Sequence, residues 1–131
     1  TIVNSLAGGR KIPIYGTGQN IRDWLFVDTH VAYLEAIMST GRLGQSYLIG
    51  GDMELTNIDL LARIHAIFSH RRPNQAQAFE ETFEFVTDRL GHDRRYAIDT
   101  SRLNLHFPEV KGVNFDRALG ETVDFYLANN D

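Results

Sequence analysis

A short basic segment stands out in an otherwise acidic chain. Between Asp88 and Tyr96 the sequence reads DRLGHDRRY, which places three arginines around His92. The chain as a whole carries a formal net charge of -4, so this positive charge is local. Arginines gathered in this way suit a small anion such as a diphosphate. A structural alternative stays open, in which the same arginines form ion pairs on a solvated face with Glu80, Glu81, Glu84 and Asp93.

Arg22 is a second residue whose surroundings point to an anion. It lies in the segment IRDWLFV (residues 21–27), which has the alternation of a strand and several large apolar side chains. A guanidinium beside such side chains is costly unless it meets an anion. That anion is either a ligand or a neighbouring carboxylate, Asp23 or Asp28, and the sequence leaves both open.

The chain lacks the motifs that would carry catalysis, a cofactor or a metal. The segment GTGQNI (16–21) imitates a dinucleotide fingerprint, but Ile21 replaces the third glycine and a β segment follows, so a tight turn is the better account. No tyrosine is followed four residues later by lysine, no histidines have metal spacing, and no serine lies in a GxSxG elbow. We expect no catalytic, cofactor-binding or metal-binding residue here.

Length and composition predict one globular unit, residues 1–131. A chain of this length, 43% of it apolar, can bury one core. Its net negative charge argues against nucleic-acid binding, where basic surface dominates affinity. No apolar run approaches the roughly 20 residues that span a bilayer, and neither a signal peptide nor a cysteine is present. We therefore expect no nucleic acid, no membrane and a cytoplasmic location.

Turn signals divide the sequence into alternating short strands and helices, which predicts an α/β fold. Residues 11–15 and 21–27 are expected to be strands, and the turn between them favours a hairpin. Pro13 restricts the first of them to an edge position. Three further extended segments are expected at residues 46–49, 83–86 and 96–98.

Capping residues and apolar spacing predict three helices. The first begins at Asp28, carries Val31, Leu34 and Met38 on one face, and ends at Gly41. We expect this apolar stripe to belong to the core.

The second helix begins with Thr56 and Asp59 as a capping box, and the third begins at Asn114. Their inward-facing residues are expected to be Leu60, Leu61, Ile64, Ile67 and Phe68, followed by Phe115, Ala118, Leu119, Thr122 and Tyr126. These stripes are also expected to be core and not cofactor contacts.

Four sequence blocks resemble dTDP-glucose 4,6-dehydratases, which are extended short-chain dehydrogenases. The blocks follow the family's order and spacing, extend over most of the chain, and are most specific in the last one. They are IPIYG (12–16), GQNIRDWLFV (18–27), YLIGG (47–51) and DRLGHDRRYAID (88–99). The resemblance also implies an initial helix at residues 2–8.

The resemblance implies the carboxyl-terminal, substrate-binding lobe of such an enzyme, with short strands, three to five helices and no Rossmann half. The whole enzyme would be an NAD-dependent lyase that oxidises the glucose C4 hydroxyl, eliminates water across C5 and C6, and returns the hydride to C6. Its Rossmann half, with the NAD fingerprint and the catalytic residues, would precede Thr1, so the chain alone is expected to be inactive. The full-length enzyme is expected to be a homodimer.

The resemblance also assigns residues to the binding of a dTDP-sugar. Arg22, Arg89 and His92 would contact the nucleotide and its diphosphate, with residues 13–15 beside the thymine. The complete expected set is Pro13, Ile14, Tyr15, Arg22, Asp88, Arg89 and His92. One departure from the family pattern is Leu48, which stands where the family has an asparagine amide.

Two alternatives remain open from the sequence. The first is the same lobe from another nucleotide-sugar epimerase, dehydratase or decarboxylase, which the preference for dTDP-, UDP- or GDP-sugars would distinguish. The second is a non-enzymatic module that self-associates, because a lobe that packs on a partner domain exposes apolar surface.

Overall fold

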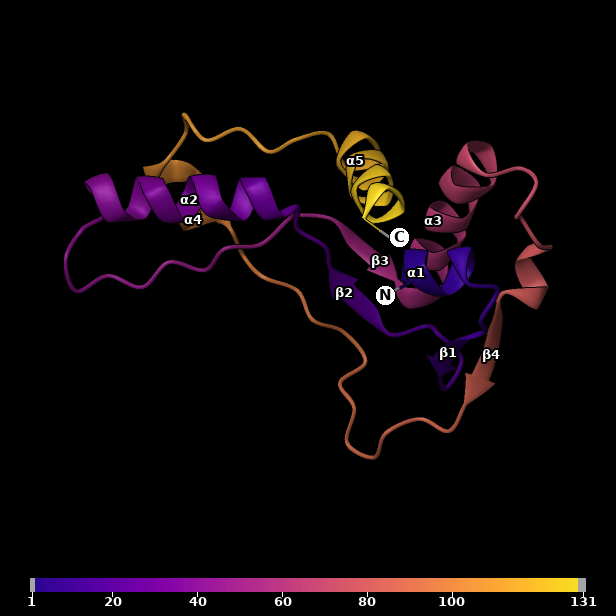
Figure 1. Ribbon diagram of the computed structural model, residues 1–131. Helices are drawn as coiled ribbons and strands as arrows, with labels where there is room; N and C mark the ends of the chain where they lie inside the picture. The colour runs from indigo at the N-terminus through magenta and orange to yellow at the C-terminus, as the bar shows by residue number, and fades with distance from the viewer. Residues whose placement is uncertain (1, 130–131) are drawn as a thin grey trace.

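The computed structural model describes residues 2–129 (Figure 1). Short strands and helices alternate along the chain, which confirms the predicted α/β class. In order, the elements are α1 (Ile2–Ala7), β1 (Ile12–Tyr15), β2 (Ile21–Asp23), α2 (Val27–Thr40), β3 (Glu54–Thr56), α3 (Asn57–Arg71), the 3-10 helix η1 (Phe79–Glu81), β4 (Phe83–Val86), α4 (Ser101–His106) and α5 (Phe115–Ala128). No helix in this range is long and apolar enough to cross a membrane.

The strands pair with partners that are distant in sequence. β1 pairs with β4 in parallel, so that Ile12 lies opposite Phe83 and Tyr15 opposite Val86. β2 pairs with β3 in the antiparallel sense. The predicted hairpin between the first two strands is therefore wrong, because the turn at residues 16–20 carries the chain from one two-stranded sheet to the other.

The main core lies where α1, α3 and α5 pack together beside β1 (Figure 1). Leu61, Phe68 and Val123 are almost completely buried in it. Burial of one such side chain contributes about 1.5–3 kcal/mol, so these three helices supply much of the stability of the chain. The predicted α3 stripe is confirmed, whereas Tyr126 at the end of α5 is exposed and not turned inward.

Both α3 and α5 begin at the predicted capping residues. The Thr56 hydroxyl accepts a hydrogen bond from the backbone N–H of Asp59 at 3.1 Å and donates to the Asp59 carboxylate at 2.6 Å. At α5, the Asn114 side-chain oxygen accepts from the backbone N–H of Arg117 at 3.1 Å. These bonds satisfy N–H groups that have no partner inside the helix, which explains why each helix begins where it does.

The apolar stripe predicted on the first long helix does not enter the core. Val31, Leu34 and Met38 on α2 are all exposed, and Met38 keeps 86% of its surface accessible. α2 packs through its opposite side, where Tyr33 joins a second, smaller cluster with Leu103. Figure 1 shows α2 with α4 set apart from α1, α3 and α5.

Two predicted extended segments are not strands. Residues 46–49 carry no strand hydrogen bonds within the described range, and Leu48 is exposed. Residues 96–98 also lie outside any strand, although Arg95 forms a single parallel bridge with Ile21. β-forming composition does not suffice for a strand, because a strand also needs a neighbour with which to pair.

The segment that leads into β3 depends on close contact between the backbone at Gly51 and residues 23 and 24. Its backbone N–H donates to Asp23 Oδ2 at 2.8 Å, and the N–H of Met53 donates to Asp23 Oδ1 at 3.0 Å. A Cβ placed on Gly51 would collide with the carbonyl oxygen of Trp24. Only glycine therefore allows the backbone to reach Asp23 here.

We expect Gly51→Ala to destabilise the chain by about 2 kcal/mol or more, because the new methyl group meets rigid backbone. Gly120→Ala is a matched control: position 120 lies inside α5 with open space around it. There the same change should stabilise by about 0.5–1 kcal/mol through helix propensity. Urea unfolding followed by circular dichroism measures both, and equal effects at the two sites would contradict the packing argument.

Removal of the α3 cap should also be measurable. Thr56→Ala deletes the hydroxyl that accepts from Asp59, and we expect a loss of about 1 kcal/mol in the free energy of unfolding. Ser39→Ala removes an exposed hydroxyl that bonds only to a carbonyl of its own helix, Glu35, and should change stability by less than about 0.5 kcal/mol. A Thr56→Ala effect no larger than that of Ser39→Ala would refute the assigned cap.

Candidate functional site

The parallel pairing of β1 with β4 places the ends of these two strands side by side. Tyr15 and Gly16 leave β1 next to the point where Asp88 follows β4, and the N–H of Gly16 donates to the carbonyl of Val86 at 2.9 Å. Gly16 has a φ of +58°, and a Cβ on it would lie 2.8 Å from Asp88 Oδ2. Glycine thus permits both the turn and the close approach of Asp88.

The loop that follows β4 is fastened to β2 by backbone hydrogen bonds. The N–H of Ile21 donates to the carbonyl of Arg94 at 2.9 Å, and the N–H of Tyr96 donates to the carbonyl of Ile21 at 3.1 Å. The Asn20 side chain adds a longer contact, 3.4 Å, to the carbonyl of Asp93. These bonds bring the basic segment to the strand that carries Arg22.

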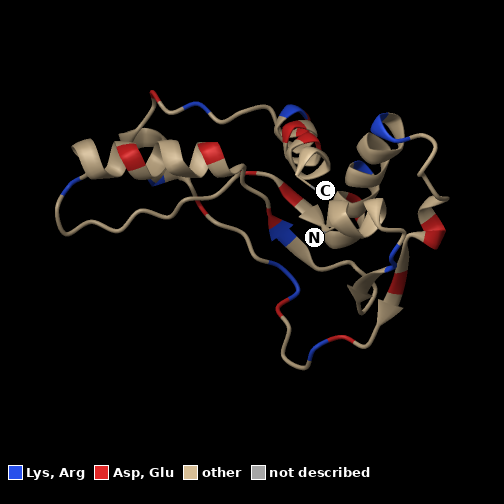
Figure 2. Ribbon diagram, in the orientation of Figure 1, with Lys and Arg blue, Asp and Glu red and all other residues tan. Residues whose placement is uncertain are grey.

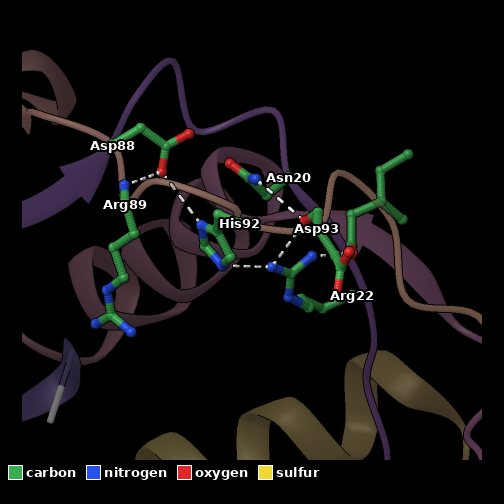
Figure 3. A network of polar contacts seen from close by, with 7 residues as sticks. Asn20, Arg22, Asp88, Arg89, His92 and Asp93 are labelled. Carbon is green, nitrogen blue, oxygen red and sulfur yellow. Dashed lines mark hydrogen bonds and ion pairs between the residues drawn. The ribbon is translucent and has the colours of Figure 1, made fainter.

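Arg22 reaches across this junction and makes several polar contacts (Figure 3). Its Nη2 lies 2.7 Å from His92 Nε2 and 3.2 Å from the carbonyl oxygen of Asp93, and its Nη1 donates to the carbonyl of Ile21 at 2.6 Å. The guanidinium also lies over the ring of Tyr96, 4.4 Å from the ring centre. Stacking on an aromatic face holds the guanidinium plane while leaving edge N–H groups for other acceptors.

Arg89 is held in a similar way at the end of β1. Its guanidinium lies over the ring of Tyr15, 4.5 Å from the ring centre. In Figure 3 its side chain extends away from the contacts that join Asp88, His92 and Arg22. Each of the two arginines is therefore supported by a tyrosine ring.

The side chain of Asp88 contacts other residues of the loop in which it lies. Its Oδ1 accepts from the backbone N–H of Arg89 at 2.8 Å and lies 3.2 Å from His92 Nδ1. The contacts with His92 and with the Arg89 N–H hold the pKa of the Asp88 carboxyl below its usual range. The carboxylate is thus ionised at neutral pH, and its negative charge lies beside Nδ1 of His92.

The contacts of Arg22 exclude the carboxylate partners considered from the sequence. Asp23 is occupied by the backbone of residues 51 and 53, and the side chain of Arg22 meets carbonyl oxygens and His92 instead. Within residues 2–129, neither Arg22 nor Arg89 forms an ion pair with a carboxylate. Both arginines therefore retain charge that an anion can neutralise.

The remainder of the basic segment is partly neutralised inside the protein. Arg95 forms a two-bond ion pair with Glu54, at 2.5 and 2.7 Å, and this partner is not among the carboxylates expected from the sequence. The hydrogen bond from Arg95 lowers the pKa of Glu54, which lies on β3. Figure 2 shows basic and acidic positions following one another along the loop after β4.

The three expected base-binding residues on β1 do not all face the same way. Ile14 is 6% exposed and belongs to the main core, whereas Pro13 is exposed and Tyr15 is half-buried. Alternation along the strand accounts for this difference. The side chains that can meet a ligand are thus those of Pro13 and Tyr15, and Ile14 anchors the strand.

Sequence reasoning did not identify the contribution of Tyr96 or of Asp23. Tyr96 follows the basic segment directly, but its position over Arg22 depends on the bridge between the loop and β2. Asp23 was considered as a counter-ion and instead fixes the backbone at Gly51. No local pattern in the sequence distinguishes these roles.

The glycine turn between the first two strands does not fit NAD. The carbonyl oxygens of Gly18 and Asn20 accept the N–H groups of Ile58 and Asn57, so the turn itself occupies the start of α3. Gly18 has a φ of +72°, and a Cβ there would lie 2.8 Å from a methyl group of Ile14, which explains the glycine by packing. Residues 2–129 also contain no cluster of three metal-binding side chains.

Comparison with known proteins connects this geometry to one family. The family model for GDP-mannose 4,6 dehydratase matches residues 1–115. The curated dTDP-glucose 4,6-dehydratase of Xanthomonas campestris is 37% identical over 129 residues, which are 98% of this chain and 37% of that protein. The chain thus spans little more than a third of the length of this relative.

Two solved structures match the same range. A dTDP-glucose 4,6-dehydratase from Bacillus anthracis in complex with NAD has a TM-score of 0.84 and 35% identity, over 98% of this chain and 38% of that one. The enzyme from Streptomyces venezuelae with NAD and TYD bound has a TM-score of 0.82 and 32% identity, over 98% and 37%. The chain therefore belongs to the GDP-mannose 4,6 dehydratase family, and these three relatives are dTDP-glucose 4,6-dehydratases.

Proposed function

We propose that this chain is the substrate-binding lobe of a dTDP-glucose 4,6-dehydratase and binds the dTDP part of a dTDP-sugar. One observation carries the proposal: two arginines from separate segments are each supported by a tyrosine ring and have no carboxylate partner in residues 2–129. A diphosphate is the anion that such a pair suits, because hydrogen bonds from a charged guanidinium to phosphate oxygens are short and strong. The relatives' names supply the nucleotide.

Each part of the site has a role in this proposal. Arg22 and Arg89 bind the diphosphate, and His92 lies beside Arg22. Pro13 and Tyr15 present their side chains at the end of β1, next to Arg89, and line the thymine side. Ile14 supports this strand from the core. Asp88 contacts His92 at Nδ1, on the side of the ring opposite to Arg22.

The chemical conversion belongs to the longer polypeptide. We propose that residues 1–131 are one lobe, which closes over the substrate while a Rossmann half binds NAD and supplies the groups for oxidation and elimination. NAD would provide the hydride acceptor and donor of this reaction. In this proposal the lobe contributes substrate binding and orientation, and the turn at residues 16–20, which does not fit the cofactor, supports that division. A homodimer of the full-length protein remains part of the proposal.

Apolar surface on the lobe is consistent with such a partner domain. A groove open to solvent runs between the segment that follows β2 and the helix α5. Leu25, Phe26, Phe115 and Phe125 are among its mainly apolar lining residues. Surface of this kind on a soluble chain marks a contact with another protein segment. In the proposal that segment is the remainder of the same polypeptide.

We expect isothermal titration to detect saturable binding of dTDP to the 131-residue chain. Arg89→Ala and Arg22→Ala should each weaken binding by about 1.5–3 kcal/mol, because each removes charge-assisted hydrogen bonds to phosphate. Arg63→Ala is the matched control: Arg63 pairs with Asp116 on the α3–α5 surface, and its loss should leave dTDP affinity unchanged.

UDP, GDP and NAD in the same titration test the competing assignments. NAD should not bind. Preference for UDP or GDP over dTDP would favour a lobe from another nucleotide-sugar enzyme. Equal affinity of the Arg89→Ala variant and the unsubstituted chain would remove Arg89 from the site.

A different observation supports self-association as a second candidate function. Val27, Val31, Leu34 and Met38 form an exposed apolar stripe along α2, on a helix whose other side is already packed. A second copy of the chain can cover this stripe when no partner domain is present.

Sedimentation velocity tests this candidate. The sedimentation coefficient should rise with concentration, and Met38→Glu should suppress the rise because it places a charge in the apolar contact. Ser39→Glu adds the same charge at a neighbouring exposed position outside the stripe and should leave association intact. A strictly monomeric chain at high concentration would reject self-association without affecting the nucleotide site.

A further inference from the structure

The contact between Arg22 and His92 indicates which ring nitrogen of the imidazole carries the hydrogen. Arg22 Nη2 and His92 Nε2 are 2.7 Å apart. A guanidinium nitrogen only donates hydrogen bonds, so Nε2 has to accept and cannot carry a hydrogen. A neutral imidazole then carries its hydrogen on Nδ1.

The opposite side of the ring agrees with this arrangement. His92 Nδ1 lies 3.2 Å from Asp88 Oδ1, and the carboxylate is an acceptor without a hydrogen of its own. The same oxygen accepts the backbone N–H of Arg89 at 2.8 Å, which fixes the carboxylate in place. Asp88, His92 and Arg22 therefore form one directed chain, in which Arg22 donates to His92 and His92 donates to Asp88 (Figure 3).

We propose that Asp88 is a positioning residue, which selects the Nδ1–H form of His92 and thereby keeps Nε2 available to hold Arg22 in its binding orientation. This inference rests on the proposed function, in which Arg22 binds the diphosphate. Asp88 itself does not touch the ligand. The hydrogen-bonded connection from Asp88 to Arg22, which lies on β2 and 70 residues from His92 in sequence, runs through the imidazole ring.

The other tautomer of His92 would disrupt the contact with Arg22. With the hydrogen on Nε2, an N–H group of His92 would face an N–H group of Arg22 at hydrogen-bond distance, and the contact would be repulsive. Arg22 would then keep only its carbonyl contacts, to Ile21 and Asp93, and its position over Tyr96. Loss of a fixed orientation weakens phosphate binding because the side chain has to be ordered again when the ligand binds.

A purely structural role for Asp88 makes a different prediction. If Asp88 served only to bond the N–H of Arg89 and order the loop, its removal would lower stability without changing the tautomer of His92. The tautomer of His92 in a variant without the Asp88 carboxylate therefore separates the two roles, and it can be measured without any ligand.

Long-range proton–nitrogen correlation spectra of the uniformly ¹⁵N-labelled 131-residue chain, at about pH 8 where an unperturbed imidazole is neutral, provide this measurement. His92→Gln identifies the His92 signals among the five histidines by their loss. We expect a protonated Nδ1 and an unprotonated Nε2. A protonated Nε2 in the unsubstituted chain would overturn the proposal directly.

Two variants of Asp88 extend the test. Asp88→Ala should shift His92 toward the Nε2–H form and weaken dTDP binding about tenfold, the lower end of the range for a hydrogen bond to a charged group. Asp88→Asn keeps an acceptor oxygen at the same place and should rescue most of the Nδ1–H form and most of the affinity. Asp99→Ala is the matched control, since Asp99 also accepts a backbone N–H, that of Ser101, at an exposed loop position.

The outcomes distinguish this inference from the proposed function. An unchanged tautomer in Asp88→Ala, or an altered tautomer with unchanged dTDP affinity while Arg22→Ala still weakens binding, overturns the positioning role and leaves the nucleotide site in place. Absence of dTDP binding by the unsubstituted chain overturns the proposed function, and the positioning role falls with it. Asp99→Ala should change neither the tautomer nor the affinity.

Discussion

The parallel pairing of β1 with β4 is the constraint on which the candidate site depends. It sets Tyr15 beside Asp88 and Arg89, although these residues come from opposite halves of the chain. Bridging of the following loop to β2 then brings His92 to Arg22. The two paired strands bring these groups together through their backbone hydrogen bonds. Both are anchored by side chains such as Ile14 and Phe83 against the core of α1, α3 and α5, so packing energy is what holds the polar groups together.

Some charged side chains at the site are paired inside the protein, and others are not. The unpaired ones determine what the site can bind. Arg95 is neutralised by Glu54, and Asp23 is used by backbone N–H groups. Arg22 and Arg89, in contrast, meet aromatic faces and neutral or backbone acceptors. An acidic protein can in this way carry local positive charge that is not neutralised internally, while its overall negative charge repels long polyanions.

Features that depend on neighbouring residues could be predicted from the sequence, and features that depend on distant pairing could not. The caps at Thr56 and Asn114 and the buried stripe of α3 follow from local chemistry and were correct. The hairpin was wrong because turn residues show where a chain reverses and not which strand it joins. The α2 stripe was wrong for a related reason: apolar spacing indicates that one face is suited to burial, but the partner for that face has to come from elsewhere. The candidate anion site could be predicted as a set of arginines, whereas the tyrosine supports and the contacts through His92 depend on segments that are distant in sequence.

The wide sequence separation of the paired strands also affects when the site can form. Arg22 and His92 are 70 residues apart, and β1 has no strand partner until β4 has been synthesised. Contacts between distant residues form slowly because a long loop has to be ordered before any of them contributes. During synthesis, the helices α1 and α3 can begin to pack while the polar junction is still open, since its last members leave the ribosome after most of the core residues. A ligand that bridges the two arginines would bind only the completed junction, and it would thereby stabilise the folded chain relative to states in which the junction is open.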